Sequence, residues 1–207
     1  TQIKTVILTS VGEMLGMRGI LVNFVVRKIR KMVPKFSLPN TVAFKDALKQ
    51  GRKFTVKPFK STADDTIALQ YTGGTTGVSK GAMLTNRNLV ANMLQIKAWL
   101  SPVLEEREVV ALCPLPLYHI FAFTVNCLAF MLCGGKNILI VNARDLPALI
   151  KEWRTHNPNI VTGVNTLFNA LINNPDFGKI DFSTWKLALG GGMAVQRAVA
   201  EKWKQVT

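Results

Sequence analysis

Short apolar runs alternate with helical patterns five times between residue 67 and the end of the chain. The runs are too short for helices and are rich in Val, Ile and Leu, so each predicts a strand buried on both faces. These predicted strands cover residues 67–70, 109–113, 137–141, 159–162 and 186–189. Strands that alternate with helices form a mostly parallel sheet with right-handed crossovers. The sequence therefore predicts an α/β fold in which helices flank such a sheet.

Polar residues that can cap helices stand at three of the predicted strand-to-helix junctions. Thr85, Asp145 and Asn165 each precede a helical pattern and can accept a hydrogen bond from its first turn. The stretch 120–132 is apolar apart from Thr124 and Asn126 and ends at a pair of glycines, which predicts a buried core helix. It is shorter than the roughly eighteen apolar residues of a membrane span, so no transmembrane helix is predicted.

Positive charge is concentrated at the beginning of the chain. The formal net charge is +14, and residues 1–60 hold thirteen basic and two acidic residues, a net charge of +11. A strand at 3–8, a helix at 11–33 and a surface connector at 39–61 are predicted there. The basic helix suits anionic lipid headgroups, or it is a solvated face that packs against a further part of the protein. No aromatic residue interleaves with the basic cluster of this helix, which disfavours nucleic acid as a partner.

Cysteine and histidine do not form a metal-binding pattern. Cys113, Cys127 and Cys133 lie in apolar runs without metal-type spacing, so reduced core cysteines in a cytosolic protein are predicted. The two histidines, His119 and His156, have no accompanying carboxylate cluster. The chain also shows no charged-then-apolar leader.

A glycine-rich segment, residues 71–81, follows the first predicted strand. Eight of its eleven residues are Gly, Thr or Ser, and Lys80 adds a positive charge. Glycines allow backbone N–H groups to turn towards one point, which makes an anion-binding concavity suited to a polyphosphate. The segment is no Walker A loop, because Gly81 follows Lys80, and Gly-x-Gly-x-x-Gly does not occur. A flexible linker is disfavoured by the strand before it and the capped helix after it.

Residues 71–81 resemble the phosphate-binding signature of the adenylate-forming enzymes, which include acyl-CoA synthetases, luciferases and peptide-synthetase adenylation domains. Gly73 stands where that signature often has Ser, and Ser79 where it often has Pro. Three further segments are similar to family motifs: residues 114–119, 163–168 and 189–194. The amino-acid sequences of these motifs most resemble those of bacterial long-chain fatty acyl-CoA synthetases.

This resemblance implies a role for each segment. It assigns phosphate binding to Tyr71, Thr72, Gly73, Gly74, Thr75, Thr76, Gly77, Val78, Ser79, Lys80 and Gly81. His119 would orient the carboxylate or gate the acyl pocket, the alternative being a core imidazole. Phe121 and Phe123 would line the acyl channel, or be ordinary core residues, and Gly163 and Asn165 its other side. The loop Gly190, Gly191 and Gly192 would contact adenine, the alternative being a tight turn.

The implied activity is that of an acid–thiol ligase, part of an ATP-dependent long-chain fatty acid–CoA ligase that uses Mg²⁺. The carboxylate would attack the α-phosphate of ATP, and CoA thiolate would then displace AMP. The family's Thr and Glu on the Mg²⁺ side, its hinge and its adenylation Lys lie beyond these motifs. Residues 61–207 are therefore predicted to be a portion of the large N-terminal domain, catalytically incomplete alone, and no metal ligands are assigned.

Two alternatives remain. The chain could belong to another acyl or aryl acid–CoA ligase, or it could be an ATP-binding or anionic-membrane-binding module without catalysis. A cytoplasmic location is expected, with residues 11–60 as the segment that would attach peripherally to the inner face of the cell membrane. Acyl chain-length preference depends on cavity depth, which no motif encodes.

Overall fold

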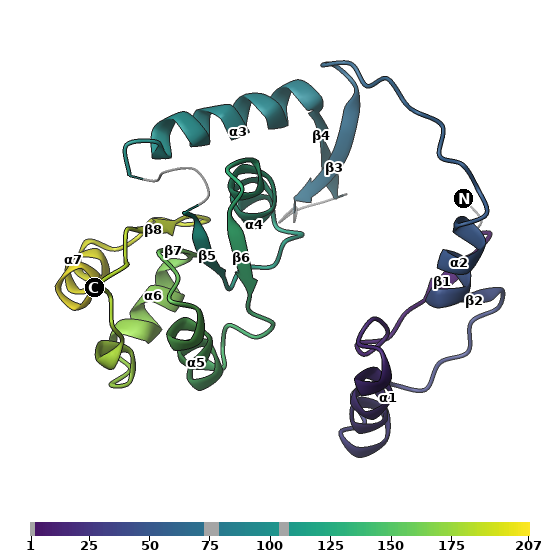
Figure 1. Ribbon diagram of the computed structural model, residues 1–207, viewed down its shortest axis with the longest axis horizontal. Helices are drawn as coiled ribbons and strands as arrows, with labels where there is room; N and C mark the ends of the chain where they lie inside the picture. The colour runs from purple at the N-terminus through teal and green to yellow at the C-terminus, as the bar shows by residue number, and fades with distance from the viewer. Residues whose placement is uncertain (1–2, 73–78, 104–107) are drawn as a thin grey trace. The chain divides into compact units, whose positions relative to one another are not determined.

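The protein, seen here as a computed structural model, forms two compact units, Thr1–Lys60 and Ser61–Thr207 (Figure 1). The structure describes residues 3–72, 79–103 and 108–207. Within these residues, no helix combines the length and the apolar character needed to cross a bilayer.

The first unit contains two short strands and two helices. Strand β1 (Val6–Leu8) pairs in parallel with β2 (Thr41–Ala43), which leads into helix α2 (Phe44–Gly51). Helix α1 (Met17–Phe24) continues as the π-helical segment η1 (Val25–Ile29).

The predicted helix at 11–33 is wrong at both of its ends, since residues 11–16 form turns and the helix stops at Ile29. Gly16 has a φ of 58°, a left-handed conformation that only glycine adopts without strain and that interrupts the helical path. Before it, the backbone of Gly12 packs directly against that of Gly19. The Gly12 N–H also donates to Asn23 Oδ1 at 2.9 Å, so a side chain stabilises the turn.

The second unit begins with a β-hairpin, which the sequence did not predict. Strand β3 (Thr66–Thr72) pairs antiparallel with β4 (Lys80–Thr85), and the two strands form a sheet of their own. The prediction that the glycine-rich segment leads straight into a helix is therefore wrong. The first of the five expected strand–helix repeats is a hairpin followed by a helix.

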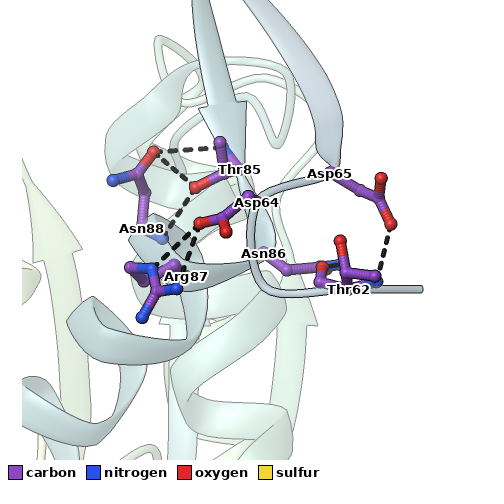
Figure 2. Close-up of polar contacts among 7 residues, drawn as sticks. All are labelled: Thr62, Asp64, Asp65, Thr85, Asn86, Arg87 and Asn88. Carbon is purple, nitrogen blue, oxygen red and sulfur yellow. Dashed lines mark hydrogen bonds and ion pairs between the residues drawn. The ribbon is translucent and has the colours of Figure 1, made fainter.

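Hydrogen bonds at the base of this hairpin hold helix α3 (Asn86–Leu100) in place (Figure 2). Thr85 caps the helix as predicted: its Oγ1 accepts from the Asn88 N–H at 3.3 Å, and Asn88 Oδ1 accepts from the Thr85 N–H at 3.0 Å. Arg87 pairs with Asp64 Oδ1 at 3.1 Å. The start of α3 is thus tied to the segment that precedes β3, at the end of the hairpin where Thr66 pairs with Thr85.

Four parallel strands form the main sheet in the order β6-β5-β7-β8, which confirms the predicted fold class. Their bounds are Val110–Cys113 for β5, Lys136–Leu139 for β6, Ile160–Gly163 for β7 and Leu187–Gly190 for β8. Helix α4 (Ile120–Ala122) continues as the π-helical η2 (Phe123–Phe130) and packs with α3 over one face. The other face carries α5 (Leu146–His156), α6 (Asn165–Ile172) and α7 (Arg197–Val206).

Consecutive residues of a strand pack into the two apolar cores on opposite faces of the parallel sheet. Ala111 and Ile160 pack with α3 and η2, whereas Leu112 and Val161 pack with α5 and α6. Burial on both faces is the reason that these strands read as continuous apolar runs. On the α5–α7 side, rings from several elements pack together: Trp153, Phe168, Phe177, Phe182, Trp185 and Trp203. The short 3₁₀ segment η3 (Phe177–Lys179) contributes one of them.

Several local predictions are confirmed and one cap is wrong. Asp145 caps α5, because its Oδ1 accepts from the Ala148 N–H at 3.1 Å. The apolar helix at 120–132 is a core helix. Of the three cysteines expected in the core, Cys113 is buried, whereas Cys127 and Cys133 are half-buried. Asn165 is instead the first residue of α6, with Val164 at the cap position. Its side chain is engaged elsewhere, since Oδ1 accepts from the Gln196 N–H at 2.9 Å.

Candidate functional site

Three segments that are distant in the sequence meet at the carboxyl ends of β7 and β8. The Gly191 N–H donates to the Gly163 carbonyl at 3.1 Å, which joins the two glycine-containing ends. The ring of Phe121, from the start of α4, lies against Gly191. Ligands of parallel α/β sheets bind outside the carboxyl ends of the strands, so this edge is the candidate site.

Close packing against aromatic rings explains why glycine occupies these positions. A Cβ built on Gly191 would lie 2.9 Å from Cε1 and Cζ of Phe121. A Cβ on Gly163 would lie 2.8 Å from Cζ of Phe168, well inside ordinary contact distance. Gly192 needs glycine for a different reason, because its φ of 77° is left-handed. Close packing and the left-handed φ thus explain the glycines at 190–192 as parts of a tight turn. Such a turn is compatible with a ligand-binding role.

His119 lies at the entrance to helix α4, and its side chain is exposed. The alternative of a core imidazole is therefore wrong. Its Nδ1 accepts a hydrogen bond from the Phe121 N–H at 3.3 Å, so the ring caps the short helix. Nε2 is then the ring nitrogen that can contact a substrate. Phe121 and Phe123 are half-buried, and this degree of burial fits both a wall of the acyl channel and an ordinary core position.

Two apolar cavities open near this edge. One, of about 390 Å³, is lined by Leu115, Ala143, Arg144, Leu146, Val164, Thr166, Leu167 and Ala170. The other, of about 290 Å³, is lined by Phe168, Ala188, Gly190, Val195, Val199, Ala200 and Trp203. Their linings suit hydrocarbon better than phosphate. Gly190 was predicted as a site residue, and five others lie in the motif-like segments 114–119 and 163–168: Leu115, Val164, Thr166, Leu167 and Phe168. The remaining lining residues were not predicted, because a cavity arises from packing between elements and has no motif.

The described part of the phosphate-binding segment forms the ends of the hairpin strands. Tyr71 pairs with Gly81 and Thr72 with Lys80, and the Tyr71 ring covers Gly81, with Cζ 3.2 Å from the position of a Cβ there. Ser79 and Lys80 are exposed. The predictions for Gly73, Gly74, Thr75, Thr76, Gly77 and Val78 lie outside the described residues.

The expectation that both glycine loops follow strands of one sheet is wrong. Strand β3 belongs to the hairpin, whereas the 190–192 loop follows β8 of the parallel sheet. Membership of one sheet therefore does not bring the phosphate segment to the 190–192 loop. Within the parallel sheet, the carboxyl ends of β7 and β8 do lie together, since Gly163 and Gly191 are hydrogen-bonded.

Comparison with known proteins decides the family. The profile of the family described as AMP-binding enzyme matches residues 21–207. The chain belongs to the AMP-binding enzyme family.

Relatives of this AMP-binding chain are long-chain-fatty-acid–CoA ligases. It is 52% identical to that of Yersinia pestis and 50% identical to that of Escherichia coli O157:H7, over 100% of this chain and 37% of each relative. The chain thus spans little more than a third of the length of these relatives.

Solved structures share the fold. The fatty acyl-adenylate ligase from L. pneumophila, in complex with acyl adenylate and pyrophosphate, matches with a TM-score of 0.65 at 21% identity. The match covers 86% of this chain and 32% of that one. At this identity the likeness concerns the fold alone, and it agrees with the parallel sheet described above.

Proposed function

We propose that this AMP-binding chain is a portion of an ATP-dependent long-chain fatty acid–CoA ligase, an acid–thiol ligase. The observation that carries the proposal is identity of 50–52% to such ligases along the whole chain. The substrates would be a fatty acid, ATP and CoA. Residues 61–207 would be part of the large nucleotide-binding domain, and residues 1–60 a separate basic segment.

The residues at the carboxyl ends of β7 and β8 would form the nucleotide and acyl sites. Gly190, Gly191 and Gly192 would present their backbone to adenine, since close approach requires the absence of a side chain. Phe121 and Gly163 would border the acyl group, and the adjoining apolar cavities would suit its hydrocarbon part. Asn165 would position the loop through its bond to the Gln196 N–H rather than contact the substrate.

The chemistry assigned to this site requires no protein nucleophile. A fatty carboxylate attacks the α-phosphate of ATP, pyrophosphate leaves, and CoA thiolate then attacks the acyl carbon and releases AMP. The chain's contribution would be to position the reactants and to stabilise the charge on the phosphates. Residues 71–81 with Lys80 would hold the β- and γ-phosphates, and His119 Nε2 would orient the carboxylate. Mg²⁺ is given no ligands, because no group of three or more His, Cys, Asp or Glu among the described residues could hold a metal.

Nucleotide titration of the purified chain tests the phosphate-binding assignment. Lys80→Ala should weaken ATP binding about tenfold or more, because a charge-assisted hydrogen bond contributes roughly 1.5–3 kcal/mol. The matched control is Lys204→Ala, which removes an equally exposed cation from the last turn of α7. Equal affinity of the Lys80→Ala and Lys204→Ala variants for ATP would reject the assignment.

ATP–pyrophosphate exchange with palmitate tests whether the chain is catalytically complete. We expect no turnover from the chain alone, because its relatives are almost three times as long. Exchange at a rate near that of a full-length relative would contradict this expectation. Replacing palmitate with an aryl acid in the full-length protein separates a fatty acid ligase from the alternative acyl or aryl ligases.

A second candidate function is binding of the first unit to an anionic membrane surface. Met17, Ile20 and Leu21 on α1 are exposed within this unit, to 89%, 74% and 67%. Arg27 and Lys28 follow them on η1, so apolar and cationic groups lie on one continuous helix. This combination is typical of interfacial helices, and it would place the protein peripherally on the inner face of the membrane.

Liposome sedimentation decides between membrane binding and a surface that another part of the protein covers. The chain should sediment with anionic vesicles and much less with neutral ones, and deletion of residues 1–60 should abolish the difference. Sedimentation that is indifferent to vesicle charge would eliminate the membrane function.

A further inference from the structure

A buried polar network connects the helix that carries Phe121 to two strands of the sheet. Asn126 lies on η2 and is 0% exposed, and Thr162 on β7 is also 0% exposed. The Thr162 hydroxyl donates to Asn126 Oδ1 at 2.9 Å. Asn126 Nδ2 donates to Asn137 Oδ1 at 3.2 Å, and Asn137 Nδ2 returns a bond to the Asn126 carbonyl at 2.9 Å.

The placement of this network is unusual for its surroundings. On the same helix, Ala122, Val125, Ala129 and Phe130 are apolar and buried. Burial of a carboxamide there is unfavourable unless all of its groups are hydrogen-bonded, a condition that Asn126 meets. An apolar side chain would be sufficient for packing. The carboxamide adds directional hydrogen bonds to its partners.

Directional bonds restrict how the helix can sit on the sheet. Asn137 is on β6 and Thr162 is on β7, and β5 runs between them. Asn126 therefore holds η2 from both sides of the central strand, which limits both sliding and rotation of the helix. Hydrophobic contacts alone are non-directional and would tolerate small shifts.

The helix position determines where Phe121 lies. Phe121 is in the first turn of α4, which runs without a break into η2. Its ring lies against Gly191, whose N–H is bonded to Gly163, the residue that follows Thr162. The network and the candidate site are thus linked through Thr162–Gly163 on one side and through the helix on the other.

We propose that Asn126 is a positioning residue. Through Thr162 and Asn137 it fixes helix α4–η2 so that the Phe121 ring stays against Gly191 at the carboxyl ends of β7 and β8. The consequence for ligand binding rests on the proposed function, because it assumes that the 190–192 loop binds the nucleotide.

The structure offers a matched control at the opposite end of the strands. Asn159 is also a buried asparagine; its Oδ1 accepts from the Val110 N–H at 2.9 Å, and its Nδ2 donates to the Glu108 carbonyl at 2.5 Å. These bonds lie at the amino ends of β5 and β7. Asn159→Leu therefore removes comparable buried hydrogen bonds without touching the helix that carries Phe121.

Nuclear magnetic resonance of the chain tests the positioning directly. In the wild-type chain, Phe121 ring protons should show a nuclear Overhauser effect to the Gly191 α protons. Asn126→Leu and the milder Thr162→Val should weaken this effect and shift the Gly191 amide resonance. Thr162→Ser, which keeps the hydroxyl, should restore both signals. Asn159→Leu should lower thermal stability and leave both signals in place.

ATP titration supplies the functional readout. Asn126→Leu and Thr162→Val should weaken ATP binding roughly threefold to tenfold, the equivalent of one lost hydrogen bond, and Asn159→Leu should leave it unchanged. The proposal is overturned if the Gly191 signals survive in folded Thr162→Val, or if Asn159→Leu disturbs them equally. A wild-type chain that binds no ATP would refute the proposed function, whereas the resonance comparison would still decide the role of Asn126.

Discussion

Substitution of Gly163 by alanine probes the packing that shapes the candidate site. The added Cβ would lie 2.8 Å from Cζ of Phe168 and 3.1 Å from its Cε1. Ordinary carbon–carbon contacts are roughly 3.5–4.0 Å, so the ring must move by about 0.7–1.2 Å. Phe168 is 4% exposed and stands edge-on to Trp203, with the ring centroids 4.8 Å apart. The contact with Trp203 opposes this movement, whereas the cavity of about 290 Å³ that Phe168 borders lets the ring give way in part.

The expected size of the effect follows from two opposing terms. Overpacking of a core costs about 1–3 kcal/mol. Replacement of a strand glycine by alanine returns about 0.5–1 kcal/mol, because the unfolded chain loses freedom. Gly163→Ala should therefore lower the free energy of unfolding by about 1 kcal/mol, the middle of a range of roughly 0–2.5 kcal/mol, which corresponds to roughly 2–4 °C in Tm for a domain of this size.

Urea unfolding followed by tryptophan fluorescence measures this difference, because three of the four tryptophans lie in the ring cluster beside Phe168. Gly178→Ala is the matched control: no heavy atom of the described residues lies within 4 Å of its Cβ position. That variant should stay within about 0.5 kcal/mol of the wild type. If Gly163→Ala is as stable as Gly178→Ala, the packing argument for glycine at this edge is incorrect.

Three further outcomes are expected. The hydrogen bond from Lys179 holds the pKa of the exposed Asp176 below its ordinary value, so its stabilisation is present at neutral pH and is lost as pH falls through that lowered pKa. Lys179→Ala should raise this pKa in a carboxyl resonance titration, and an unchanged pKa would exclude the pairing. Burial raises the pKa of the Cys113 thiol, so iodoacetamide should modify Cys113 much more slowly than Cys127 by mass spectrometry; equal rates would contradict its burial. Asp145→Ala should cost about 1 kcal/mol in urea unfolding through loss of the α5 cap, with Asp145→Asn retaining most of it, and equal losses would argue against the cap.

Strand β4 was not predicted because its sequence lacks the patterns that indicate a strand. Residues 80–85 contain no β-branched apolar residue and no clear alternation. They form a strand because β3 offers them a hydrogen-bonding edge, and only pairing supplies that stabilisation. The helix expected at 11–33 failed for a related reason, because the close approach of Gly12 to Gly19 is a backbone contact outside the regular hydrogen bonding of a helix.

Apolar runs, capping residues and glycine motifs were sufficient to predict the parallel sheet, the start of α3 at Thr85 and the family. Each of these depends on neighbours within a few positions, so the information is local and the sequence alone determines it. The partners of each site residue were decided by the tertiary structure. That Phe121 meets Gly191, that Phe168 covers Gly163, and that Asn126 joins two strands depend on how helices settle on the sheet. The Phe121–Gly191 and Asn126–Thr162 contacts join residues tens of positions apart, and the Phe168–Gly163 contact depends on how α6 packs beside the end of β7, so no spacing in the sequence encodes them.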